Sequence, residues 1–156
     1  MRSEVVWTVF MQQAVDGKYG APFPEGELVN GEMNDSHIQF YHQPNEGGAL
    51  ASTEINIYPM EDNPVEAYET IKNESLEPKS WRQEGHEVDG WKEWPTGFPD
   101  RNDYEGVSHC GITQDGNKVV WVQGKALVVL FSMAGEKMLR EYADGVWNVV
   151  YAALGK

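Results

Sequence analysis

Cysteine is nearly absent from the 156-residue sequence: Cys110 stands alone, so no disulfide bond can form within the chain. Basic residues are also scarce, because 12 lysines and arginines are set against 25 aspartates and glutamates, giving a formal net charge of −13. So negative a chain is a poor match for the phosphate backbone of a nucleic acid. The longest apolar run spans only residues 126–131, whereas a membrane-spanning helix needs about 20 residues. We therefore expect neither nucleic-acid binding nor membrane insertion.

Motifs for catalysis and for metal binding are missing as well. The histidines match no zinc-binding spacing, and His109 and Cys110, adjacent on a predicted strand, would point to opposite faces. Carboxylate pairs are expected on any acidic surface and do not by themselves identify an active site. No glycine-rich phosphate loop with its lysine occurs. The sequence therefore predicts no catalytic residues, no metal ligands and no cofactor.

Length and composition are those of an ordinary folded domain. Apolar residues make up 40% and charged residues 24% of the sequence. One domain typically takes about 100–200 residues, so we expect a single domain over residues 1–156. The N-terminal residues lack the apolar core of about 7–15 residues that a signal peptide requires. We expect a cytoplasmic protein, or a periplasmic one if an export signal has been removed.

The first part of the chain contains three candidate strands. Residues 4–11 are rich in β-branched and aromatic side chains and predict a strand, and residues 37–42 predict a second. Residues 50–58 alternate between a mostly apolar and a mostly polar side, which is typical of an antiparallel strand covered on one face. The apolar side of this strand comprises Ala51, Thr53, Ile55 and Ile57.

Two amphipathic helices are predicted. The first covers residues 63–76, with Asn63 as the N-cap and Pro64 in the first turn. The second covers residues 132–154, with Ser132 as the cap, and its apolar positions follow helical spacing. These apolar positions are Leu139, Tyr142, Ala143, Val146, Val149, Val150 and Ala153.

A meander of three strands separates the last helix from the middle of the chain. Residues 107–114, 118–123 and 126–131 are the predicted strands, and Asp115-Gly116 is a strong hairpin signal between the first two. Together these patterns predict an α+β fold: a single antiparallel β-sheet with a central and a C-terminal amphipathic helix packed on it.

An irregular, polar segment over residues 79–105 is the least regular part of the sequence. It contains five large aromatic residues and a possible short strand at 87–94. Residues 61–105 hold 13 acidic and 5 basic residues, so much of the negative charge lies here. Aromatic residues among carboxylates are typical of a protein-binding surface. The alternative is a solvated loop whose aromatics form a small core of their own. The five aromatics are Trp81, Trp91, Trp94, Phe98 and Tyr104.

The order and spacing of these elements resemble the Mog1/PsbP-like fold, a family that includes DcrB-like proteins and the effector-associated chaperones of type VI secretion. The likeness starts at Phe23-Pro24-Glu25-Gly26, continues through the strand and helix of residues 51–76 and Val88-Asp89-Gly90-Trp91, and ends with the meander and closing helix. Members mostly bind proteins or small ligands, so the resemblance implies a binding role.

The function we expect is that of a non-catalytic protein-binding module, either a chaperone or adaptor, or an immunity-type inhibitor, of a bacterial secretion or toxin system. Its partner would present a basic or apolar surface. Two alternatives remain: a PsbP-like protein that holds a small ligand or lipid between sheet and helix, and an enzyme with an unrecognised carboxylate site. The expected partner-binding residues are Trp91, Trp94 and Phe98, framed by Glu87, Asp89, Glu93, Asp100 and Asp103.

Overall fold

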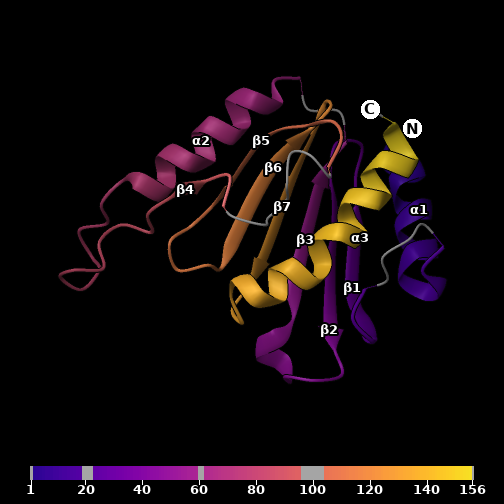
Figure 1. Cartoon of the computed structure of the whole chain (residues 1–156), viewed down its shortest axis with the longest axis horizontal. Coiled ribbons are helices and arrows are strands. Elements are labelled where there is room, and N and C mark those ends of the chain that lie inside the picture. The colour runs from indigo at the N-terminus through magenta and orange to yellow at the C-terminus, as the bar shows by residue number, and fades with distance from the viewer. Residues whose placement is uncertain (1, 19–22, 60–61, 96–103, 156) are drawn as a thin grey trace.

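A computed structural model describes residues 2–18, 23–59, 62–95 and 104–155 (Figure 1). Within these ranges seven strands form one antiparallel sheet in the spatial order β1-β2-β3-β7-β6-β5-β4. The predicted α+β fold with one antiparallel sheet is therefore confirmed. The strands are β1 (Gly26–Met33), β2 (Ile38–Pro44), β3 (Thr53–Tyr58), β4 (Lys92–Glu93), β5 (Val107–Ile112), β6 (Lys118–Gln123) and β7 (Ala126–Ser132).

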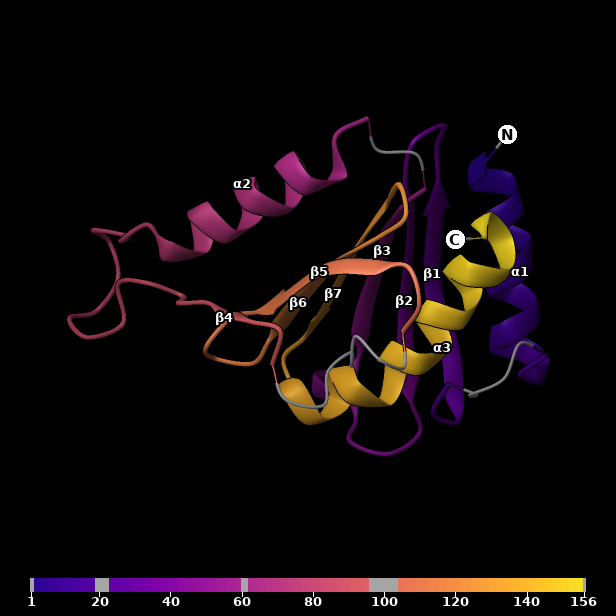
Figure 2. The same ribbon diagram turned by 45° about the horizontal axis from the view of Figure 1, so that its top comes forward.

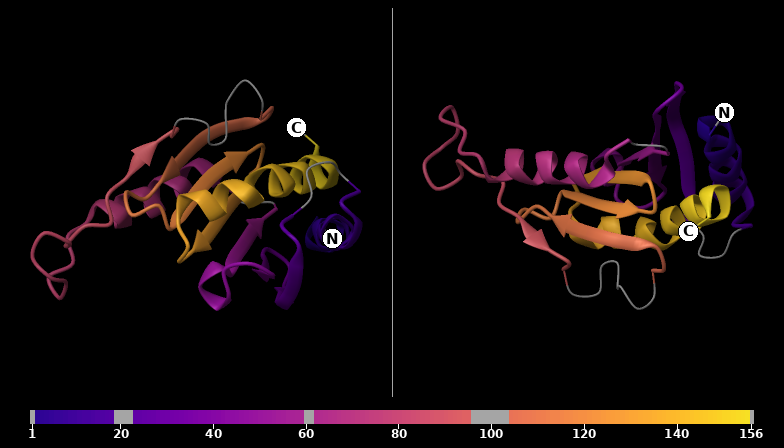
Figure 3. Two further views of the ribbon diagram at one scale, coloured as in Figure 1. Left: turned by 60° about the horizontal axis from the view of Figure 1, so that its bottom comes forward. Right: turned by 90° about the horizontal axis from the view of Figure 1, so that it is seen from above.

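Helices cover the two faces of the sheet unequally. The helices are α1 (Arg2–Asp16), α2 (Pro64–Leu76) and α3 (Glu136–Leu154), and a short 3-10 turn covers Ala49–Ala51. α1 and α3 pack against each other on one face, whereas α2 packs on the other face over β5, β6 and β7 (Figures 1 and 2). On the face that carries α2, the described helices do not cover β1 and β2 (Figure 3).

The main core lies between the sheet and the pair α1 and α3. Phe10 of α1 stacks on Phe40 of β2 with ring centroids 3.7 Å apart. The fully buried Trp121 of β6 donates its indole N–H to Gln123 at 3.0 Å, and the Gln123 amide donates to the backbone oxygen of Trp147 in α3 at 3.1 Å. These bonds satisfy the indole N–H of Trp121 and an amide N–H of Gln123, and they tie β6 to α3.

The prediction of a strand over residues 4–11 is wrong, because this segment lies inside α1. The buried residues of the helix recur every three or four positions, which is the period of one helix face. β-branched and aromatic residues favour strands only weakly, and packing against a sheet overrides that preference. The buried residues are Ser3, Val6, Val9, Phe10 and Gln13.

β1 was not predicted by any pattern in the sequence. Seven of its eight residues are exposed, and a bulge between Leu28 and Asn30 interrupts its pairing with β2. A strand with no buried side lacks the alternation of apolar and polar residues by which strands are recognised. Its existence depends on pairing with β2, whose alternate residues are buried.

The meander and the two predicted helices are present with small changes at their ends. The turn between β5 and β6 is closed by Asp115, whose carboxylate accepts the backbone N–H of Asn117 at 2.9 Å. α3 begins at Glu136 with Gly135 as its N-cap, and not at Ser132. The hydroxyl oxygen of Ser132 instead accepts the N–H of Ala134 at 3.2 Å, which uses it in the preceding turn. None of the helices in the described ranges combines the length and the hydropathy needed to cross a bilayer.

Replacing Phe10 with alanine tests the placement of α1. Because Phe10 is buried and stacked on Phe40, we expect the Phe10→Ala variant to lose about 3–5 kcal/mol of unfolding free energy. Val15 of the same helix is 78% exposed, so Val15→Ala should change stability by less than about 0.5 kcal/mol. Urea denaturation of both variants provides the measurement, and equal losses would contradict this placement.

A buried histidine should make the stability depend on pH. His42 of β2 is 2% exposed, and its Nδ1 shares a hydrogen bond with the hydroxyl of Tyr142 in α3. Burial lowers the pKa of His42 below its ordinary value. As the pH falls below about 6.5, His42 is protonated in the unfolded chain but stays neutral in the folded chain. The free energy of unfolding therefore decreases.

The pH effect can be isolated by comparing the wild type with a His42→Gln variant. Other titrating groups contribute equally to both, so the difference in unfolding free energy reports His42 alone. We expect the wild type to lose stability relative to the variant between pH 7 and pH 5.5, by at most about 1.4 kcal/mol per pH unit. Parallel profiles for the two proteins would show that His42 accepts a proton in the folded state.

Candidate functional site

An arm of the chain, residues 77–90, stands away from the body of the molecule. It follows the C-terminal end of α2 and returns to the sheet at β4, and Figures 1 and 2 show it as the loop that projects furthest from the sheet. Most of its residues are exposed. Because the arm makes little contact with the core, its conformation must be held by bonds within it and at its base.

The arm is held by hydrogen bonds at its base and along its length. At the base, the N–H of Gly90 donates to the Ser75 oxygen in α2 at 3.0 Å, and the N–H of Gln114 donates to the Asp89 oxygen at 3.2 Å. Further out, the N–H of Lys79 donates to the Glu87 oxygen at 2.8 Å, which joins the two sides of the arm. The arm is therefore ordered although it is largely outside the core.

Trp81 is the most prominent side chain of the arm. It is 78% exposed, and the guanidinium carbon of Arg82 lies 5.2 Å from the centroid of its ring. Arg82 in turn forms an ion pair with Asp89 on the opposite side of the arm. A cation placed over an indole ring is held by the quadrupole of the ring, so Trp81, Arg82 and Asp89 form one chain of contacts across the arm.

The sequence singled out Trp91 and Trp94 for binding, and the structure places them at the root of the arm, both half-buried. Trp91 packs on the α2 face of the sheet, edge-on to the ring of Tyr68 at 5.7 Å between centroids. Trp94 packs against the main core on the opposite face. The two indoles therefore hold the edge of β5 from both sides.

Two local features of the backbone make this arrangement possible. Gly111 of β5 has no side chain, and a Cβ built there would lie well inside van der Waals contact with the Trp91 indole. Trp94 has a φ of 44°, which is uncommon for any residue other than glycine. Its N–H donates to the Cys110 oxygen at 2.6 Å, which fixes this turn of the chain against β5.

Three of the five carboxylates expected around the tryptophans lie among the described residues, and each has a partner within the chain. Glu93 of β4 forms an ion pair with Lys72 of α2. Asp89 is paired with Arg82, as described above. Glu87 accepts the N–H of Gly85 at 3.0 Å, and backbone N–H groups of Glu87 itself and of Gly85 lower the pKa of its carboxyl. These three carboxylates hold the arm and its root in place.

Three of the expected residues, Phe98, Asp100 and Asp103, lie outside the described residues. Trp81 is one of the five aromatic residues of this segment but is not among the expected binding residues. The sequence does not distinguish it from Trp91 and Trp94, because the exposure of a tryptophan in a polar segment cannot be determined from the neighbouring residues. Gly111 is a sequence signal for this packing, because a glycine inside a predicted strand can leave room for a large side chain over the strand.

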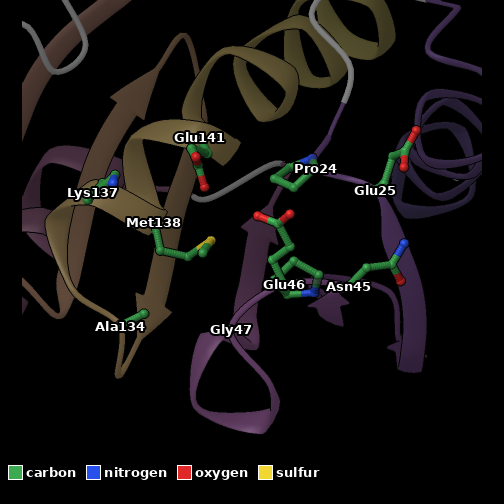
Figure 4. Close-up of a pocket in the computed structure, with 10 residues that line it drawn as sticks. Pro24, Glu25, Asn45, Glu46, Gly47, Ala134, Lys137, Met138 and Glu141 are labelled. Atoms are coloured by element: carbon green, nitrogen blue, oxygen red, sulfur yellow. The ribbon is translucent and has the colours of Figure 1, made fainter.

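A separate hollow of about 430 Å³ opens between the start of α3 and the connection after β2. Figure 4 shows the carboxylates of Glu46 and Glu141 directed into it together with the thioether chain of Met138. Both glutamates are exposed, so the hollow is a feature of the surface. It is distinct from the space between the sheet and α3, which buried side chains such as Trp121, Leu139 and Val146 fill.

Cys110 and His109, the adjacent thiol and imidazole, lie on opposite faces of β5. The thiol of Cys110 is buried in the main core, and burial raises its pKa far above the ordinary value. His109 faces the other side of β5, where its ring lies 5.4 Å from that of Tyr68. Within the described ranges, no group of three or more histidine, cysteine, aspartate or glutamate side chains is arranged to hold a metal ion.

The contact between Trp91 and Gly111 can be tested with a double-mutant cycle. In the wild-type background, Gly111→Ala should cost about 2 kcal/mol of unfolding free energy, because the new methyl group displaces the Trp91 indole. In a Trp91→Ala background the same change should cost less than about 0.5 kcal/mol, since the space is then free. Urea denaturation of the four proteins measures the coupling, and additive effects would contradict the contact.

A comparison of the chain with protein-family models, with curated proteins and with solved structures finds no match. The likeness to the Mog1/PsbP-like fold therefore stands on the sequence pattern alone, and the functional argument depends on the geometry of the arm and of the sheet.

Proposed function

We propose that this chain is a non-catalytic protein-binding module and that the arm, residues 77–90, is its contact surface. The observation that carries the proposal is Trp81, an indole 78% exposed at a distance from the core. Tryptophan is among the residues that most often dominate the binding energy of protein interfaces. Its place on a projecting arm leaves the indole accessible to a partner from outside the body of the molecule.

The order of the arm supports the same proposal. A flexible loop that becomes fixed on binding loses conformational entropy, and this loss weakens the complex. Here the bond between Lys79 and Glu87 and the contacts of Arg82 with Trp81 and Asp89 hold the arm in the free protein. The arm can therefore present Trp81 in one geometry, which favours rigid docking.

The charge of the molecule indicates the kind of partner. The whole chain carries a formal charge of −13, and Glu77 and Glu84 are exposed on the same arm as Trp81. Such a field speeds the approach of a basic partner, and Trp81 would then bury against an apolar patch. A chaperone or adaptor, or an immunity-type inhibitor, of a bacterial secretion or toxin system fits this description, since each acts by covering a partner.

Photo-crosslinking from the arm tests the proposal. A benzoylphenylalanine residue at position 81 should capture a protein partner in cells that express the chain, whereas the same residue at position 15 should not. Val15 of α1 is the matched control, because it has the same exposed fraction as Trp81, 78%. Equal crosslinking from the two positions would contradict the arm as the binding surface.

Affinity measurements on a captured partner give the second readout. Trp81→Ala should weaken binding by about 30-fold or more, which corresponds to about 2 kcal/mol for a central interface residue. Because Trp81 is exposed, the melting temperature of the free protein should stay unchanged. A variant that binds as tightly as the wild type would rule out Trp81 as the centre of the interface.

A further inference from the structure

The outer edge of the sheet at β1 is unoccupied by any described strand. β2 is the only neighbour of β1 in the part of the chain that the structure describes, and seven of the eight β1 residues are exposed. An edge of this length offers a row of backbone N–H and C=O groups to another chain. The bulge between Leu28 and Asn30 interrupts the row, so residues 30–33 form its longest regular stretch.

The pairing with β2 determines which backbone groups of β1 face outward. Hydrogen-bonded and non-hydrogen-bonded pairs alternate along an antiparallel ladder. The N–H of Asn34 donates to the His37 oxygen. Gly31 and Phe40 form the third pair further along the ladder, which is a non-hydrogen-bonded pair, so the backbone groups of Gly31 point away from β2. The outward N–H of Gly31 donates to the side-chain oxygen of Asn30 at 2.8 Å, a contact that an incoming carbonyl group can replace.

The two sides of this edge differ in chemistry. On the open face, Glu27 and Glu32 stand opposite Gln43 and Gln39 of β2. Nearby, burial raises the pKa of Tyr41, and the charges of Glu54 and Glu32 raise it further. The sequence holds no lysine or arginine between Lys18 and Lys72. β1, β2 and β3 therefore carry no lysine or arginine that could neutralise Glu27 and Glu32.

The side that faces α1 is apolar. Trp7 of α1 lies over Gly31, since a Cβ at Gly31 would come within 2.9 Å of the indole. Met33 is exposed beside Ile38, with which it pairs. A strand added to β1 would therefore place one set of alternate side chains against Trp7 and Met33, and the other set beside Glu27 and Glu32.

We propose that β1 binds an extended segment of a partner protein in which basic residues alternate with apolar ones, added to the sheet as an eighth strand. Backbone hydrogen bonds to residues 30–33 would supply affinity, and the alternating side chains would supply selectivity. This site lies on a different element from the arm and does not depend on it.

A second copy of this chain is a poorer occupant of the edge. Antiparallel pairing of two β1 strands over residues 30–33 would put their Glu32 carboxylates at facing or diagonal positions, where like charges repel. Each copy also brings a formal charge of −13. A basic segment meets the same carboxylates with attraction, and this difference selects it over self-pairing.

The test uses a blocked peptide of alternating lysine and valine, seven residues long, as the probe. Titration followed by nuclear magnetic resonance should shift the amide signals of residues 30–33, and a peptide of the same composition with its lysines and valines in two separate blocks should bind at least tenfold more weakly. Two N-methylated versions of the alternating peptide, methylated on opposite sets of backbone nitrogens, should differ, because only one set faces β1. Equal binding of the two methylated peptides, or no binding of the parent peptide, would overturn the proposal.

Charge reversal on the protein gives the matched control. Glu27→Lys with Glu32→Lys should lower the affinity for the peptide at least tenfold, whereas the same changes at Glu66 and Glu69 of α2, which lie away from β1, should leave it within twofold. Trp81→Ala should also leave it within twofold, so that the edge and the arm are judged separately. Equal losses from both pairs of charge reversals, or a concentration-dependent dimer formed through β1, would refute the assignment.

Discussion

β6 is the element on which the rest of the structure depends. Five consecutive residues, 119–123, are buried because the strand is covered on both faces. Val119 and Trp121 face α1 and α3, whereas Val120 and Val122 face α2. This double burial keeps α2 on the sheet, although α2 itself has only two buried residues, Tyr68 and Ser75. The position of α2 in turn fixes the point from which the arm leaves the body.

The patterns in the sequence were informative wherever a side chain must be buried on one known side. The meander and the two predicted helices follow from turn signals and apolar periodicity, and all are present. The composition of residues 4–11 favours a strand, but the spacing of the buried Val6, Phe10 and Gln13 is that of one helix face. β1 could not have been found in this way, because its pairing with β2 is a contact between backbones and leaves no apolar pattern.

The sequence indicates the segment that contains the proposed contact surface, but not the exposure of its individual side chains. Local density of aromatics and charge identified the segment around the arm, yet the exposure of each indole depends on distant residues. Trp91 is half-buried because Gly111 of β5 leaves room for its indole. Trp94 is half-buried because its backbone, with a positive φ, directs the side chain to the main core. Glu93 forms an ion pair with Lys72, and Asp89 forms one with Arg82. Separation along the sequence does not predict these pairs.

The two hydrogen bonds at the base of the arm have a mechanical consequence. Gly90 is bonded to the last turn of α2, and Asp89 to Gln114 next to the turn between β5 and β6. The arm therefore behaves as a lever with two supports, and a force applied at its tip reaches α2 and the β5–β6 turn together. A load on the arm is shared between these two bonds.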